Sequence, residues 1–89
     1  MKFNKYIDKL PSSLIYLGLP FAFNQPINNL PNTLTHLLLN DDFNQCLEHL
    51  PHNLKYLQLG TKFNQSLDHL PLSLECLIIN GEHSVFNQP

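Results

Sequence analysis

The residues best suited to chemistry are histidines that follow acidic residues in the second half of the chain. His49 and His69 are 20 positions apart, and they directly follow Glu48 and Asp68. His52 lies three residues after His49. Imidazole and carboxylate groups are zinc ligands, and they also serve as general acids and bases in catalysis.

The equivalent positions earlier in the chain favour a solvent-exposed loop over a metal or catalytic site. Lys9 and Asn29 occupy the places that His49 and His69 take later, and such variety is typical of a solvated position. Catalytic acids and bases also need a cleft that perturbs them. No nucleophile motif surrounds the serines: Ser12, Ser13, Ser66, Ser73 and Ser84. We therefore predict no enzyme activity, no metal site and no cofactor.

These histidines belong to a unit that recurs every 20 residues. Its Phe-Asn pairs begin at Phe3, Phe23, Phe43 and Phe63, and its Leu-Pro pairs begin at Leu10, Leu30, Leu50 and Leu70. A fixed period of this length indicates a repeat solenoid, in which each coil packs on its neighbours. We place the repeats at 3–22, 23–42, 43–62 and 63–85, with a partial repeat at 86–89, in one domain of residues 1–89.

The aligned repeats also keep columns of leucine or isoleucine. In the third repeat these are Leu47, Leu50, Leu54, Leu57 and Leu59. Columns that accept only apolar residues are expected to face a shared core, whereas the column of Ile15, Thr35, Lys55 and Glu75 is expected to face water.

The end of each repeat has the spacing of a short strand. Leu57 and Leu59 are two residues apart, so they share one face of an extended segment. Stacked copies predict a leucine-rich-repeat-like fold with short parallel β-strands on one side. Each proline is expected to open one helical or 3₁₀ turn, and the other side is expected to be turns and irregular loops.

An asparagine follows the phenylalanine in every repeat. Beside a buried residue, its amide can bond backbone groups of its own coil and of the next. We predict that these residues form a structural ladder: Asn4, Asn24, Asn44 and Asn64. The alternative is an exposed turn residue, since asparagine tolerates left-handed backbone.

The residues between the inward leucines of each strand are expected to point outward, onto a concave face. Tyrosine is enriched at binding hot spots, and contiguous exposed apolar residues often mark an interface. We predict that an unknown protein partner binds here, through Tyr16, His36, Leu38, Tyr56, Gln58 and Ile78. The alternatives are that these residue types merely suit strands, and that the chain is a structural remnant or fragment of a longer array with no independent function.

Composition narrows the class of partner. The chain has 89 residues, with 43% hydrophobic, 13% charged and a net charge of −2, and all its basic residues are lysines. This argues against nucleic-acid binding.

Cys46 and Cys76 fall in different columns, so no disulfide framework is expected and a reducing compartment is favoured. With neither a signal-peptide run nor a membrane span, we expect an intracellular, cytoplasmic protein that does not contact membranes.

The repeated motif is similar to that of a known family. The residues that carry the resemblance are Phe23-Asn24-Gln25-Pro26-Ile27, Leu30-Pro31-Asn32-Thr33-Leu34 and Leu37-Leu38-Leu39. They resemble the FNIP repeat, a leucine-rich-repeat-like unit, and the likeness extends over residues 3–89. The resemblance implies an origin in amoebae or in giant viruses that infect them. It also implies an adaptor or substrate-recognition role, since many members carry an F-box ahead of the repeats, a segment that does not precede Phe3 here.

The strands at the two ends of the predicted sheet have neighbours on one side only. We expect Leu17–Leu19 and Leu77–Ile79 each to leave one backbone edge unpaired. Because exposed strand edges recruit other chains, we expect weak self-association through these uncapped ends.

Overall fold

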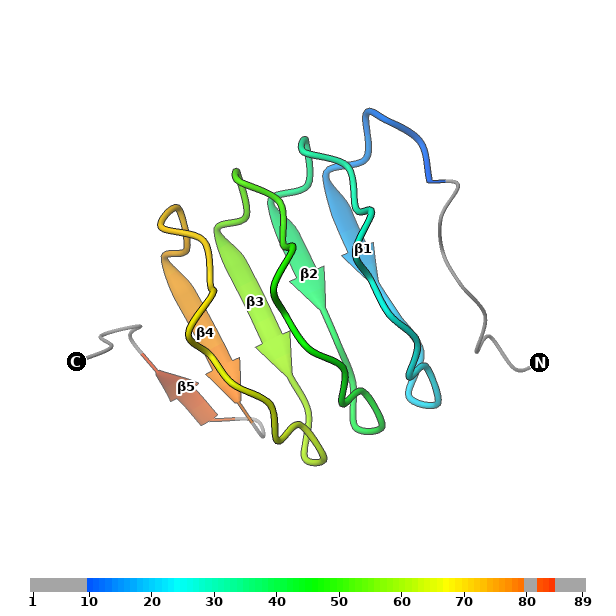
Figure 1. Ribbon diagram of the computed structural model, residues 1–89, viewed down its shortest axis with the longest axis vertical. Coiled ribbons are helices and arrows are strands. Elements are labelled where there is room, and N and C mark those ends of the chain that lie inside the picture. The colour runs from blue at the N-terminus through cyan, green and yellow to red at the C-terminus, as the bar shows by residue number, and fades with distance from the viewer. Residues whose placement is uncertain (1–9, 80–81, 85–89) are drawn as a thin grey trace.

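The main feature of the structure is one five-stranded sheet (Figure 1). The computed structural model describes residues 10–79 and 82–84. The strands lie in chain order across the sheet, and they are β1 (Tyr16–Gly18), β2 (His36–Leu38), β3 (Tyr56–Leu59), β4 (Cys76–Ile79) and β5 (Glu82–Ser84). Strands β1 to β4 are parallel, and none of the described residues is helical. The prediction of short parallel strands is confirmed.

The strand register reproduces the sequence period. Leu37 pairs with Leu17 on one side and with Leu57 on the other. The carbonyl oxygen of Ile15 accepts hydrogen bonds from the backbone nitrogens of Thr35 and His36, at 2.8 and 3.1 Å. The next two coils repeat this arrangement one step further along. Equivalent residues of successive repeats are therefore neighbours in space, and we call each repeat a coil and their succession the stack.

Two short turns reverse the chain in each coil. One begins at the proline that recurs in every repeat, where Leu54 donates its backbone N–H to the carbonyl of Pro51 at 3.3 Å. The other follows the strand, where Phe43 donates to the carbonyl of Asn40 at 3.2 Å. The predicted single turn at proline is present, and nowhere in the described residues does it extend into a helix.

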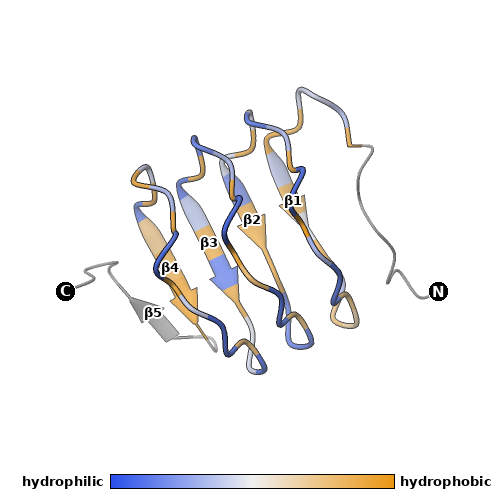
Figure 2. Ribbon diagram, in the orientation of Figure 1, coloured by the Kyte–Doolittle hydropathy of each residue, from blue (hydrophilic) through white to orange (hydrophobic). Residues whose placement is uncertain are grey.

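The core fills the space between the sheet and the returning segments. Leu37 and Leu57 are fully buried, whereas Leu17, at the start of the same column, is only partly buried. Phe23 and Phe43 stack with ring centroids 6.4 Å apart and planes 1° apart. Burying each such side chain stabilises the fold by about 1.5–3 kcal/mol. In Figure 2, β4 is drawn almost wholly in orange, whereas β1 to β3 combine orange with blue or pale segments.

The fifth strand was not predicted. β5 runs antiparallel to β4, with Ile79 opposite Glu82 and Leu77 opposite Ser84. The expectation that Leu77–Ile79 leaves an open edge is therefore wrong, and the sheet is mixed rather than wholly parallel. The two residues between Ile79 and Glu82 are Asn80-Gly81, the pair that most favours a two-residue hairpin loop.

Some expectations fall on residues outside the described ranges. They include Asn4 of the predicted ladder, the start of the first repeat, and the partial repeat at 86–89. The expectation for the free edge of β1 stays a prediction, since the residues before Leu10 are among them. Within the described ranges, no helix has the length and apolar character needed to cross a membrane.

Candidate protein-binding face

The outward side of the sheet carries a row of stacked rings. Tyr16, His36 and Tyr56 occupy paired positions on β1, β2 and β3. The ring centroids are 5.7 Å apart for the first pair and 5.5 Å for the second, with interplanar angles of 22° and 23°. Tyr16 is 58% exposed, and the other two rings are half-buried. We call these three residues the ring row, and Cys76 continues its line on β4.

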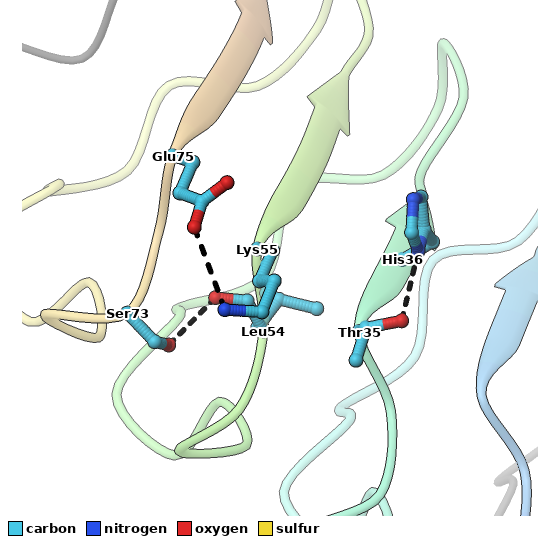
Figure 3. A network of polar contacts seen from close by, with 6 residues as sticks. All are labelled: Thr35, His36, Leu54, Lys55, Ser73 and Glu75. Atoms are coloured by element: carbon cyan, nitrogen blue, oxygen red, sulfur yellow. Dashed lines mark hydrogen bonds and ion pairs between the residues drawn. The ribbon is translucent and has the colours of Figure 1, made fainter.

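Thr35 holds the central ring of the row. Its hydroxyl oxygen lies 2.8 Å from Nδ1 of His36 (Figure 3) and 3.3 Å from the carbonyl oxygen of Ile15. A hydroxyl has a single hydrogen, so it donates either to the carbonyl, while accepting from Nδ1–H, or to Nδ1 itself. In both arrangements the imidazole is tied to the adjacent strand end.

A second line of side chains runs beside the ring row. Leu38, Gln58 and Ile78 are paired across β2, β3 and β4, and all three are half-buried. Gly18 begins this line on β1 and is exposed. The two lines together form what we call the outer sheet face. All residues predicted to contact a partner therefore lie on one surface: Tyr16, His36, Leu38, Tyr56, Gln58 and Ile78.

Ion pairs contribute little to the stability of this region. Lys55 Nζ lies 3.4 Å from Oε2 of Glu75 (Figure 3), and both side chains are more than half exposed, at 52% and 69%. Lys62 Nζ lies 3.2 Å from Oδ1 of Asp42 at the turns after the strands. Exposed pairs of this kind are worth about 0–1 kcal/mol, so packing and hydrogen bonds hold the face in place.

The histidines considered for metal binding lie elsewhere and are exposed. His49 and His69 are both at the surface, as are the neighbouring Glu48 and Asp68 and the nearby His52. In the part of the chain that the structure describes, no group of three or more His, Cys, Asp or Glu side chains is arranged to hold a metal ion.

The asparagine positions form a hydrogen-bond ladder. Oδ1 of Asn24 accepts from the backbone nitrogen of Asn44 at 2.8 Å and from Nε2 of Gln45 at 3.1 Å. Gln45 Nε2 also bonds the carbonyl oxygen of Asn24 at 3.2 Å. Asn44 receives the same three bonds from Asn64 and Gln65, at 2.8, 3.2 and 3.2 Å. The glutamines were not predicted as members of the ladder.

Sequence reasoning also missed a second polar column. Thr33 Oγ1 donates to the carbonyl of Leu14 at 2.6 Å, and Ser73 Oγ donates to that of Leu54, also at 2.6 Å. These bonds join each coil to the one before it, close to the proline turn. A signal was present, because every repeat has a small hydrogen-bonding residue in this column: Ser13, Thr33, Asn53 and Ser73.

Comparison with known families agrees with the repeat geometry. The family model described as FNIP Repeat matches residues 23–50 and 48–82. This chain belongs to the FNIP-repeat family. The matched residues contain β2, β3 and β4 with the turns that connect them. No curated protein matches the chain significantly.

The residues that define the FNIP motif build the stack and not the outer sheet face. The motif phenylalanines Phe23 and Phe43 are 1% exposed, and the motif asparagines make the ladder between coils. The outward positions, by contrast, differ from one FNIP repeat to the next. The buried scaffold is thus constant from repeat to repeat, while the outward surface varies between repeats.

Proposed function

We propose that the chain is a leucine-rich-repeat-like solenoid that recognises a protein partner through the outer sheet face, in a non-enzymatic adaptor or substrate-recognition role. The observation that carries this proposal is the ring row, in which three stacked and partly exposed rings cross three strands. Leu38 and Ile78 add partly exposed apolar area next to it.

The stacking supports recognition for an energetic reason. A binding residue that is ordered before it meets its partner loses less side-chain freedom on association. His36 has a ring on each side and a hydroxyl on Nδ1, so it is held in place before binding. Tyrosine offers a polar tip on an apolar ring, a combination enriched at interfaces.

Charge and cysteine chemistry support the remaining parts of the proposal. Lys55 and Lys62 are the lysines among the described residues, and each pairs with a carboxylate. This supports a protein rather than a nucleic acid or an anionic membrane as the partner, since phosphate binding needs clustered basic groups. Cys46 and Cys76 are both thiols, which supports a reducing, cytoplasmic setting. The proposed function requires no cofactor.

The test is affinity capture from amoebal lysate with matched double variants. The Tyr16→Ala/Tyr56→Ala protein should lose a partner that the wild type retains, while its circular dichroism spectrum stays unchanged. The Tyr16→Phe/Tyr56→Phe protein keeps both rings and should retain the partner at least in part. His49→Ala/His69→Ala, altered at exposed residues away from the strands, is the control. If all four proteins captured the same set, the outer sheet face would not be the site, and a structural segment without independent function would become the better interpretation.

A further inference from the structure

The last described rung of the asparagine ladder is open on one side. Asn64 donates its backbone N–H to Oδ1 of Asn44 at 2.8 Å. Oδ1 and the carbonyl oxygen of Asn64 are the atoms that accept three bonds in the preceding rungs, but no described residue donates to them. Asn64 is also exposed, whereas Asn24 and Asn44 are half-buried.

The same end of the stack exposes apolar surface. Phe63 stacks on Phe43 at 6.4 Å and is half-buried, whereas Phe43 is only 1% exposed. Leu67 and Leu70 are likewise less covered than their equivalents in the third repeat. We call Phe63, Asn64, Leu67 and Leu70 the end face. It combines acceptors to which no described residue donates with a ring that is only partly covered, as a docked Phe-Asn-Gln segment would require.

β5 restricts what can dock there. It occupies the hydrogen-bonding edge of β4, in antiparallel register from Ile79 to Leu77. An incoming complete coil would have to place its own strand on that same edge, so it cannot add to the stack in the regular way. A short extended segment needs only the end face, which lies outside the sheet.

We propose that the end face binds the segment Phe86-Asn87-Gln88 of a second copy of this chain. This segment lies outside the described residues, but its sequence repeats the Phe-Asn-Gln that pairs with Asn24 and again with Asn44. The backbone N–H of Asn87 donates to Oδ1 of Asn64, and the amide of Gln88 donates to the same residue, as in the two inner steps.

The direction of β5 favours exchange between copies. Asn64 follows the turn after β3, near the carboxyl ends of the parallel strands. β5 carries its own chain the opposite way, and Ser84 lies opposite Leu77. Asn87 is three positions after Ser84, a reach of about 10 Å, so the segment of the same copy would have to reverse at once. Two copies that exchange segments form a closed, symmetric pair.

Sedimentation of the full chain at rising concentration tests the proposal. The wild type should associate weakly, and Asn64→Ala and Gln88→Ala should each weaken association on the order of tenfold through lost side-chain hydrogen bonds. Asn64→Ala retains the backbone N–H that bonds Asn44, so its melting temperature should not change. His69→Ala, in the same coil and exposed, is the control and should associate like the wild type.

Mixing the two variants makes the test specific. In a mixed pair, the segment of the Asn64→Ala copy meets an intact Asn64 in the Gln88→Ala copy, so one of the two exchanges survives. Equimolar mixing should therefore recover part of the lost association. A wild type that stays monomeric up to about 1 mM, well above the range of weak specific pairs, would overturn the proposal. So would variants that associate like the wild type, a mixture without recovery, or a lowered melting temperature of monomeric Asn64→Ala, which would place the segment on its own copy.

Discussion

The side-chain oxygen Oδ1 of Asn24 lies 2.8 Å from the backbone nitrogen of Asn44 and accepts its hydrogen bond. The two residues belong to different coils and are 20 positions apart in sequence. Asn44 makes the same bond to Asn64. Each coil is therefore joined to the next outside the sheet as well as within it, and the side chain replaces the carbonyl partner that a strand would provide.

Replacing Asn44 by alanine should lower the free energy of unfolding by about 1–3 kcal/mol, because the N–H of Asn64 loses its acceptor and the amide of Gln65 keeps only the carbonyl oxygen of residue 44. Asn64→Ala should cost much less, since no described residue donates to its side chain. Urea denaturation of both variants measures the difference. Equal losses at the two positions would mean that the ladder bonds do not stabilise the stack.

Leu57 is fully buried between its neighbours on β2 and β4. Leu57→Ala should therefore destabilise the fold by about 2–5 kcal/mol through lost burial and a cavity. Lys55→Ala, two residues away, loses only a solvent-exposed pair with Glu75 and should change stability by less than about 1 kcal/mol. Thermal melts measure the stability of the two proteins, and a larger loss of stability for Lys55→Ala would refute the burial assignment.

The two described glycines differ in the space around them. A Cβ at Gly60 would lie 2.6 Å from the backbone carbonyl of Asn40, whereas a Cβ at Gly18 would meet no atom within 4 Å. Gly60→Ala should force the coils apart and cost about 1–3 kcal/mol. Gly18→Ala should be neutral or stabilise slightly, by reducing the freedom of the unfolded chain. Midpoints of urea unfolding give the comparison, and a neutral Gly60→Ala would show that the coils can separate freely at this point.

The polar column near the proline turn permits a matched test at two serines. Ser73 is half-buried and donates to the carbonyl of Leu54 at 2.6 Å. Ser66 is exposed and accepts only a local bond from the backbone of Asp68. Ser73→Ala should cost about 1 kcal/mol, and Ser66→Ala should cost about 0.5 kcal/mol or less. If the two substitutions had the same effect, the bond between coils at Ser73 would contribute nothing measurable.

The stack could be predicted because repetition makes buried positions visible. At Leu37 and Leu57 the same residue type recurs at the same position of the repeat. When the copies stack, burial in a shared core is what explains such a column. The parallel register follows from the same spacing. Another column contains different residue types that can all form hydrogen bonds: Ser13, Thr33, Asn53 and Ser73. Because the residue type varies, the structural role of this column became clear only from the contacts.

β5 could not be inferred from the columns, because the residues that form it interrupt the 20-residue phase. The relevant signal is local. Asn80-Gly81 favours a tight reversal, and this preference outweighs the expectation that a fifth coil begins. The ring row could be predicted only in part. The sequence predicts that Tyr16, His36 and Tyr56 share a face, but the hydrogen bond between Thr35 and His36 depends on side-chain geometry.

The even spacing of the ties between coils has a consequence for how the chain folds. The ladder bonds span 20 residues at every step, so closing each new coil costs about the same chain entropy as closing the last one. Only the first pair of coils must form without a neighbour already in place, and each later coil then adds to an existing template. Folding should accordingly begin where two adjacent coils are best packed, around Phe43 and Leu57, and spread outward. Unfolding should follow the reverse order, starting at the ends of the stack and moving inward.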